Sequence, residues 1–266
     1  MYTTLTTLVA RLDSSAISGT EVIRWGSPVP VFGDLAHSEI ATLGLNPSPR
    51  EFLDYDGQEL EGPSRRFHTL RSLGLISWSE ADASHIRLIA ESCRGYFLQN
   101  PYDRWFRKLD YVIAGTGASF YDVSRQACHL DLIPYATGCK WTDLKTTQRS
   151  KLLKMSGDAL ACLLRDSAVR ILILNGRSVV DHFQQIAGVP LYAEDMPTWS
   201  LPRQSTPSVV GVAYQGIVRM LAGVVLGRDV LVLGYNHNVQ SSYGVTRAVV
   251  DAIRTWISST SAQVLG

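Results

Sequence analysis

Four short segments of the chain consist mainly of aliphatic residues, and each is followed by polar or turn-forming residues. Apolar runs of this length are typical of strands that are covered on both faces, as in a parallel sheet. The predicted strands are residues 39–45, 127–133, 169–174 and 229–234.

Between these strands, apolar side chains recur at every third or fourth position, which predicts helices. The predicted helices are residues 64–73, 149–164, 177–186 and 246–257. Alternating strands and helices indicate an α/β fold with right-handed crossovers, here a three-layer α/β/α sandwich around a mainly parallel four-stranded sheet. Residues 209–225, interrupted at Gln215-Gly216, are predicted to form an edge hairpin or a strand followed by a turn. Because no repeat, linker or shift in composition divides the chain, residues 1–266 are predicted to form one domain.

Composition excludes several classes of protein. The 266 residues are 45% hydrophobic and 18% charged, which argues against a disordered chain or a coiled coil. Lys and Arg number 25 against 24 Asp and Glu, a net charge of +1. This balance argues against a protein that binds polyanions through a broadly basic surface or tail, but it leaves a local basic patch possible.

The chain also carries no sign of a membrane or of an oxidising compartment. No apolar run approaches the roughly 20 residues that span a bilayer, and the first residues lack the basic lead of a secretory signal. The four scattered cysteines form no CxxC pair, which is typical of reduced thiols. We therefore expect a cytoplasmic protein. The cysteines are Cys93, Cys128, Cys139 and Cys162.

Ligands of open α/β sheets bind beyond the carboxyl ends of the strands, so the polar residues there are candidates for a site. Asn46 follows the first strand and is stiffened by the two prolines that come after it in Asn46-Pro-Ser-Pro49, which presents its side chain in one orientation. A simple strand-ending turn is the alternative. The segment has neither a dinucleotide-binding fingerprint nor a phosphate-binding loop.

Two further strand ends carry chemically active side chains. Asp131 interrupts an apolar run, and a buried acid is costly unless it is paired or faces a site. Pairing with a nearby Lys or Arg is the alternative. His237 lies in the polar segment Tyr235–Gly244, where it could donate a hydrogen bond to a developing anion. A turn that caps the next helix would explain the same segment.

Taken together, these strand ends resemble motifs of the uracil-DNA glycosylase superfamily. The first family motif, Gly-x-Asn-Pro-Gly in the mismatch-specific and single-strand-selective branches, resembles Gly44-Leu-Asn-Pro-Ser48. A Pro-x-x-Arg-Phe segment resembles residues 63–67, and the middle strand with its base-reading Asn resembles residues 129–134. The second motif, usually His-Pro-Ser-Pro-x-Ser, resembles residues 236–242. The resemblance runs from about residue 39 to residue 257.

The resemblance implies a monofunctional glycosylase, which cleaves the bond between base and sugar after the nucleotide has been flipped out of DNA. Asn46 would orient the attacking water, and His237 would hydrogen-bond the leaving base. The reaction would need no metal and no cofactor. Because Asn46 cannot accept a proton as an Asp could, Asp54 and Asp56 are reserve candidates for a general base.

Two departures from the family favour a modified cytosine over uracil. Ser48 stands where classical uracil enzymes place a tyrosine beside C5 of the base, so a C5 substituent would fit. Asp131 stands where an Asn reads uracil, and a carboxylate accepts from the exocyclic amine of cytosine. This combination resembles anti-phage DNA glycosylases that excise glucosylated hydroxymethylcytosine.

The remaining site residues are expectations from position alone. Phe52 and Tyr55 are candidates for stacking on the base, because they follow the first motif. The candidate DNA contacts are Arg65, Arg66, Lys140, Gln240, Ser241, Ser242 and Tyr243. A uracil or mismatch repair glycosylase, a nucleic-acid-binding module without catalysis and a nucleotide or sugar-nucleotide transferase are the alternative functions.

Overall fold

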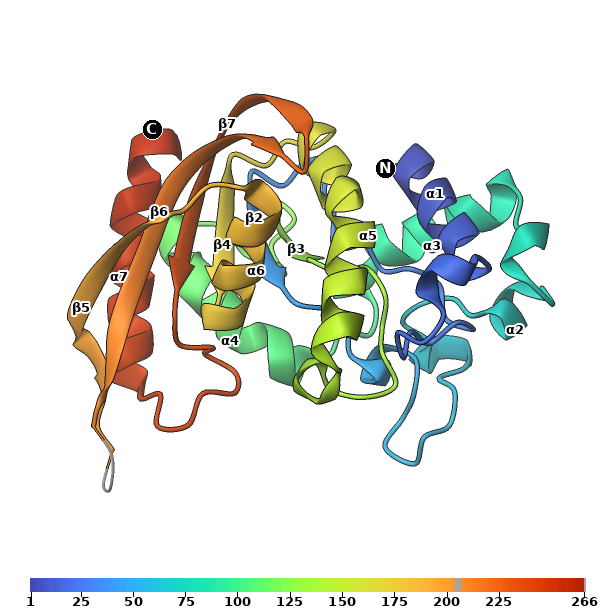
Figure 1. Cartoon of the computed structure of the whole chain (residues 1–266), viewed down its shortest axis with the longest axis horizontal. Coiled ribbons are helices and arrows are strands. Elements are labelled where there is room, and N and C mark those ends of the chain that lie inside the picture. Colours follow the sequence, from blue (N-terminus) through green and yellow to red (C-terminus); the bar gives the residue numbers. More distant parts are fainter. Residues whose placement is uncertain (204–206, 266) are drawn as a thin grey trace.

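The computed structural model describes residues 1–203 and 207–265, which fold around a seven-stranded mixed sheet with the order β1-β3-β2-β4-β7-β6-β5 (Figure 1). The strands are β1 (Val31–Phe32), β2 (Ile40–Gly44), β3 (Ala127–Asp131), β4 (Ile171–Asn175), β5 (Tyr192–Leu201), β6 (Val209–Leu221) and β7 (Val224–Tyr235). The helices are α1 (Tyr2–Leu12), α2 (Leu70–Leu73), α3 (Ala83–Arg94), α4 (Asp103–Ile113), α5 (Thr146–Arg165), α6 (Arg177–Ala187) and α7 (Arg247–Leu265).

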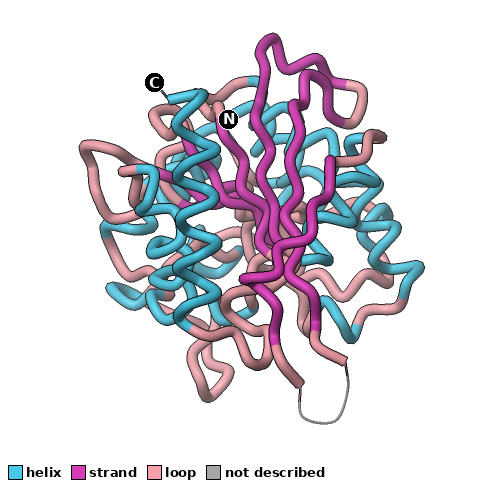
Figure 2. The backbone as a smooth tube through the Cα atoms, turned by 90° about the vertical axis from the view of Figure 1, so that its left-hand side faces the viewer, coloured by secondary structure: helices cyan, strands magenta, loops and turns pink. Residues whose placement is uncertain are grey.

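The centre of the sheet consists of the four strands that the apolar runs predict. β3, β2, β4 and β7 pair in parallel in that order. Every residue of β2, β3 and β4 is buried, because helices cover both sides of the sheet (Figure 2). On one side α5 and α6 pack together, whereas α4 packs against α7. The α/β class is therefore confirmed.

The prediction of a four-stranded sheet is wrong, because antiparallel strands extend the sheet at both edges. β1 pairs with β3, and the long strands β6 and β5 continue from β7. Residues 209–225 form a strand followed by a turn, in which Ala222 and Gly223 both adopt positive φ before β7 begins. β5 escapes prediction because it is an edge strand with mostly exposed, polar positions and an internal proline.

Helices α5, α6 and α7 confirm three predicted helices, but the helix predicted over residues 64–73 is wrong. Only α2, a single turn, forms there. The backbone around residues 68–70 instead pairs with residues 25–27, since Ser27 N donates to His68 O (2.9 Å) and Leu70 N donates to Trp25 O (2.9 Å). These groups are therefore not used within a helix. Within the described residues, the helices lack the combination of length and apolar composition that crossing a bilayer needs.

Candidate functional site

A cavity of about 810 Å³ lies at the carboxyl ends of β2, β3 and β4. Gly44, Asp131 and Asn175, the last residues of these strands, all line it. The loop after β2 supplies one wall, and the loop after β7 contributes Asn238 and Ser241. The cavity thus lies where side chains from distant parts of a parallel sheet converge.

Asn46 lines the cavity with its amide held in one orientation. Its Nδ2 donates to the Thr137 hydroxyl (3.0 Å) and to the Pro47 carbonyl (3.1 Å). Thr137 in turn donates to the Cys139 carbonyl (2.7 Å), so only its lone pairs face Asn46. Both partners therefore require the nitrogen, and Asn46 Oδ1 remains an acceptor that can hold a water molecule.

Asp131 is paired with a histidine rather than with the Lys or Arg considered from the sequence. His129 Nε2 lies 3.3 Å from Asp131 Oδ1, and His129 Nδ1 lies 2.7 Å from the Thr42 hydroxyl. When Thr42 donates to Nδ1, the proton on Nε2 faces the carboxylate. Both members of the pair are buried and line the cavity. A side chain at Gly44 would collide with them, so this pair requires glycine at that position.

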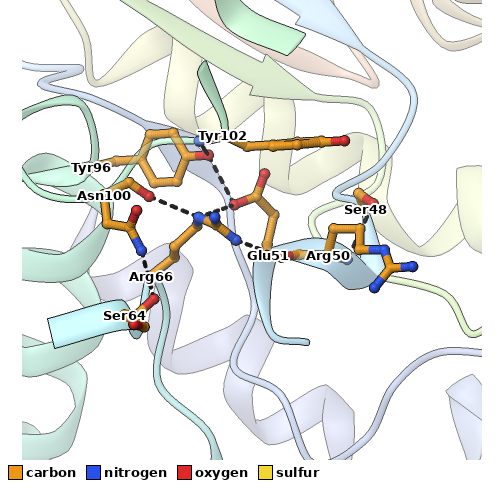
Figure 3. A network of polar contacts seen from close by, with 8 residues as sticks. All are labelled: Ser48, Arg50, Glu51, Ser64, Arg66, Tyr96, Asn100 and Tyr102. Carbon is orange, nitrogen blue, oxygen red and sulfur yellow. Dashed lines mark hydrogen bonds and ion pairs between the residues drawn. The ribbon is translucent and has the colours of Figure 1, made fainter. Parts of the chain in front are cut away.

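Glu51 is a buried acid at the cavity that the sequence reasoning did not single out. It ends the short 3-10 turn η2 (Pro49–Glu51), which is capped by Ser48, since the Ser48 hydroxyl accepts from Arg50 N (3.2 Å). Glu51 Oε2 accepts from the Tyr96 hydroxyl (2.8 Å) and lies 4.0 Å from Arg66 Nε (Figure 3). Burial raises the pKa of Glu51 to about 7.

Aromatic side chains from the start of α4 form another wall of the cavity. Tyr102 and Trp105 are half-buried and line it together with Phe106. The Trp105 ring also contacts the His129 ring edge-on, with centroids 5.0 Å apart. This wall of the cavity is therefore aromatic, which suits a flat ligand.

The two aromatic residues predicted for the base pocket do not reach it. Phe52 is buried in the core, where its ring contacts Trp25 and Phe67. Tyr55 is 74% exposed, and Cζ of Arg50 lies over its ring, 4.8 Å from the ring centroid. Neither lines the cavity, because the chain turns away from it after η2. Ser48, in contrast, lines it as expected from its position.

The structure does not bring His237 to the cavity. Its side chain is only 2% exposed, and Nε2 donates to the Trp199 carbonyl of β5 (2.8 Å). Burial lowers the pKa of the imidazole. His237 therefore does not line the cavity, contrary to the expectation that it faces a leaving base. It hydrogen-bonds a backbone carbonyl of β5, a strand that was not predicted from the sequence.

Of the candidate DNA contacts in this part of the molecule, some line the cavity and others do not. Lys140 and Ser241 are exposed at the cavity. Gln240 is bonded inside the protein, since it accepts from Asn175 Nδ2 and its own Nε2 lies 3.5 Å from the Trp105 carbonyl. Ser242 does not line the cavity, nor does Tyr243, which is 82% exposed.

Arg65 and Arg66 line a separate hollow of about 380 Å³. Arg66 is not a free cation, because its guanidinium donates to the carbonyls of Asn100 and Arg50, both at 2.7 Å. Its role in the fold is to hold the loop that carries Glu51 (Figure 3). The reserve bases Asp54 and Asp56 do not line the cavity either.

Sequence reasoning therefore missed Glu51 and His129 as members of the site. The available signal was adjacency to the motifs, since Glu51 lies five positions beyond Asn46 and His129 two before Asp131. Over residues 1–203 and 207–265, no three His, Cys, Asp or Glu side chains gather as a metal site.

The sequence was also compared with known proteins. No family model and no curated protein matches this chain. The geometry of the cavity and the motifs at the strand ends must therefore carry the functional argument.

Proposed function

We propose that the protein is a DNA glycosylase that hydrolyses the N-glycosidic bond of a flipped, modified base and leaves an abasic site. The observation that carries this proposal is the cavity at the strand ends, which unites Asn46, Asp131 and the aromatic wall at Trp105. Three distant segments thus contribute an acceptor for water, a hydrogen-bonding carboxylate and a stacking surface. The resemblance to the uracil-DNA glycosylase superfamily assigns the first two of these residues the same roles.

In this reaction the extruded base enters the cavity and stacks on Tyr102 or Trp105. Asn46 Oδ1 holds the water that attacks C1′ of the sugar, because its amide nitrogen is already occupied by Thr137 and Pro47. Fixing the water in line with the breaking bond supplies much of the rate enhancement.

The substrate that fits best is a cytosine with a substituent at C5. The free carboxylate oxygen of Asp131 accepts from the exocyclic amine of cytosine, whereas it would repel the carbonyl oxygen of uracil. Ser48 fills little space, and the cavity of about 810 Å³ leaves room for a substituent at C5. Hydroxymethylcytosine and its glucosylated form in phage DNA are therefore the proposed substrates.

Binding to DNA would rest on local cations, since the net charge is only +1. Lys140 is exposed at the cavity, and Arg50 also lines it, although its guanidinium donates to the Asp54 carbonyl. A few phosphate contacts give weak binding to unmodified DNA, which leaves selectivity to the cavity itself.

The test uses duplexes that carry uracil, cytosine, hydroxymethylcytosine or glucosylated hydroxymethylcytosine at one position. After incubation with the protein, heating in alkali breaks the strand wherever a base has been removed. Breaks at a modified cytosine support the proposal, and preferential breaks at uracil indicate a repair glycosylase instead. The burial of His237 favours one further candidate, a binding module without catalysis, which would retain DNA without any break.

A further inference from the structure

Glu51 is a buried acid with a half-satisfied carboxylate. Its side chain is 3% exposed and lines the same cavity as Asn46. The contacts of its carboxylate with Tyr96 and Arg66 both reach Oε2, as the dashed lines in Figure 3 show. Oε1 has no hydrogen-bond partner among the described residues, so one lone-pair-bearing oxygen is free at the cavity.

Several elements hold this carboxylate in place. Tyr96 lies in the 3-10 turn η5 (Tyr96–Leu98), and its hydroxyl also accepts from Tyr102 N (2.9 Å) at the start of α4. Arg66 bonds the carbonyls of Asn100 and Arg50 and thereby ties η2 to the segment before α4. The position of Glu51 is therefore fixed by hydrogen bonds from two other parts of the chain.

A purely structural role would require an acid only for the ion pair with Arg66, which is long at 4.0 Å and whose guanidinium already donates to two carbonyls. A glutamine would accept the same hydrogen bond from Tyr96 and would avoid the free-energy cost of a buried charge. A buried, incompletely paired carboxyl group in a cavity is instead typical of a residue that exchanges protons during a reaction.

We propose that Glu51 is the general base of the excision reaction, a role that rests on the proposed function. The water held by Asn46 Oδ1 gives a proton to Glu51 Oε1 while its oxygen bonds to C1′ of the sugar. The bond from C1′ to N1 breaks, and its electron pair leaves with the pyrimidine, which takes up one proton from solvent. Glu51 then releases its proton to solvent.

The charges around Glu51 set the pH at which it can act. Burial raises its pKa to about 7, the Tyr96 hydrogen bond and the Arg66 charge lower it, and the Asp131 charge raises it. The other ionisable groups at the same cavity are His129, which pairs with Asp131, Arg50 on the same turn, and Tyr102, Lys140 and Asp143. Because a base must be ionised, excision should accelerate as the pH rises to about 7 and should then level off.

The first test measures single-turnover excision from pH 5 to pH 9 on the duplex with glucosylated hydroxymethylcytosine. For the wild type we expect a rate that increases about tenfold per pH unit below the plateau. Glu51→Gln should lose about 100-fold or more in rate at pH 8 and should lose the pH dependence. The matched control is Glu194→Gln on the exposed edge strand β5, which should keep the wild-type rate and profile.

A second variant keeps the test decisive if Glu51→Gln does not fold. Tyr96→Phe removes a hydrogen bond that lowers the pKa of Glu51, so the midpoint of the profile should move to higher pH. An unmoved midpoint, a rate that falls with rising pH, or an unchanged Glu51→Gln profile overturns the general-base role while wild-type excision stands. Absence of excision by the wild type from all four duplexes overturns the proposed function and the role of Glu51 together.

Discussion

The loops after β2 and β7 are both rich in polar residues, but their side chains have different hydrogen-bond partners. In the loop after β2, Asn46 and Glu51 each leave one oxygen free at the cavity. In the loop after β7, Asn236 accepts from Val212 N (2.9 Å) and donates to Val210 O (2.7 Å), and His237 donates to a carbonyl of β5.

The difference follows from what lies next to each strand. β2 is flanked by parallel strands that end at the same level, so its loop faces open space at the cavity. β7 is flanked by β6, whose first residues continue past the end of β7 and leave backbone groups without a strand partner. Asn236 satisfies those groups. Polar residues at a strand end therefore indicate a site only where the neighbouring strands need no hydrogen bonds from them.

The largest effect is expected for Asn46→Ala. Removing the acceptor for water should reduce excision by about 100-fold or more, because one well-placed polar group at a reaction centre contributes on that order. DNA affinity, measured by fluorescence anisotropy, should change little. The matched control is Asn236→Ala in the other loop, which should lower the melting temperature but leave the excision rate of the folded protein unchanged. Near wild-type activity in Asn46→Ala would show that its proposed role is wrong.

The next effect concerns stability and does not depend on the reaction. The pKa of Glu51 is raised from its ordinary value to about 7, so the folded state binds a proton that the unfolded state releases between about pH 4.5 and pH 7. Glu51 therefore destabilises the fold increasingly as pH rises through this range. Urea unfolding of Glu51→Gln relative to the wild type should show a gain about 2–3 kcal/mol larger at pH 8 than at pH 5. An equal difference at both pH values would contradict the raised pKa.

His237→Ala should show that the loop after β7 contributes to stability and not to excision. Loss of the hydrogen bond to the Trp199 carbonyl and of buried volume should cost about 2 kcal/mol in the free energy of unfolding. Excision by the folded fraction should stay within about twofold of the wild type, since His237 does not reach the cavity. A folded variant that has lost excision would return His237 to the reaction.

The smallest effect is expected for Asp131→Asn. An amide can donate to the carbonyl oxygen of uracil, so the ratio of excision rates for uracil and modified cytosine should rise about tenfold, within the ~1–3 kcal/mol that one base-reading contact contributes. The measurement is competition between the two duplexes in one reaction. An unchanged ratio would remove Asp131 from base reading.

The sequence predicted what depends on local patterns and missed what depends on contacts between distant segments. The buried strands were visible because residues such as those of β4 are uniformly aliphatic. Asn46, Ser48 and Asp131, which the rule that sites lie beyond strand ends singled out, all line the cavity. Glu51 was not singled out, because its burial comes from Tyr96 and Arg66, which are distant in sequence.

The misplacement of His237 has a similar origin. Its partner carbonyl belongs to β5, an edge strand whose polar positions resemble a loop. Without that strand, a histidine after β7 has no visible hydrogen-bond partner and is interpreted as a free side chain. The sequence also left open which aromatic residues near the start of α4 face the site, because only the tertiary packing brings both Tyr102 and Trp105 to the cavity.

The most direct measurement is mass spectrometry of the small molecules released from DNA that carries glucosylated hydroxymethylcytosine. We expect the intact glucosylated base, with an equal amount of abasic sites in the strand, from the wild type and at least about 100-fold less from Asn46→Ala. Release of free glucose with the cytosine left in the strand, or release of uracil alone from the uracil-containing duplex, would contradict the account.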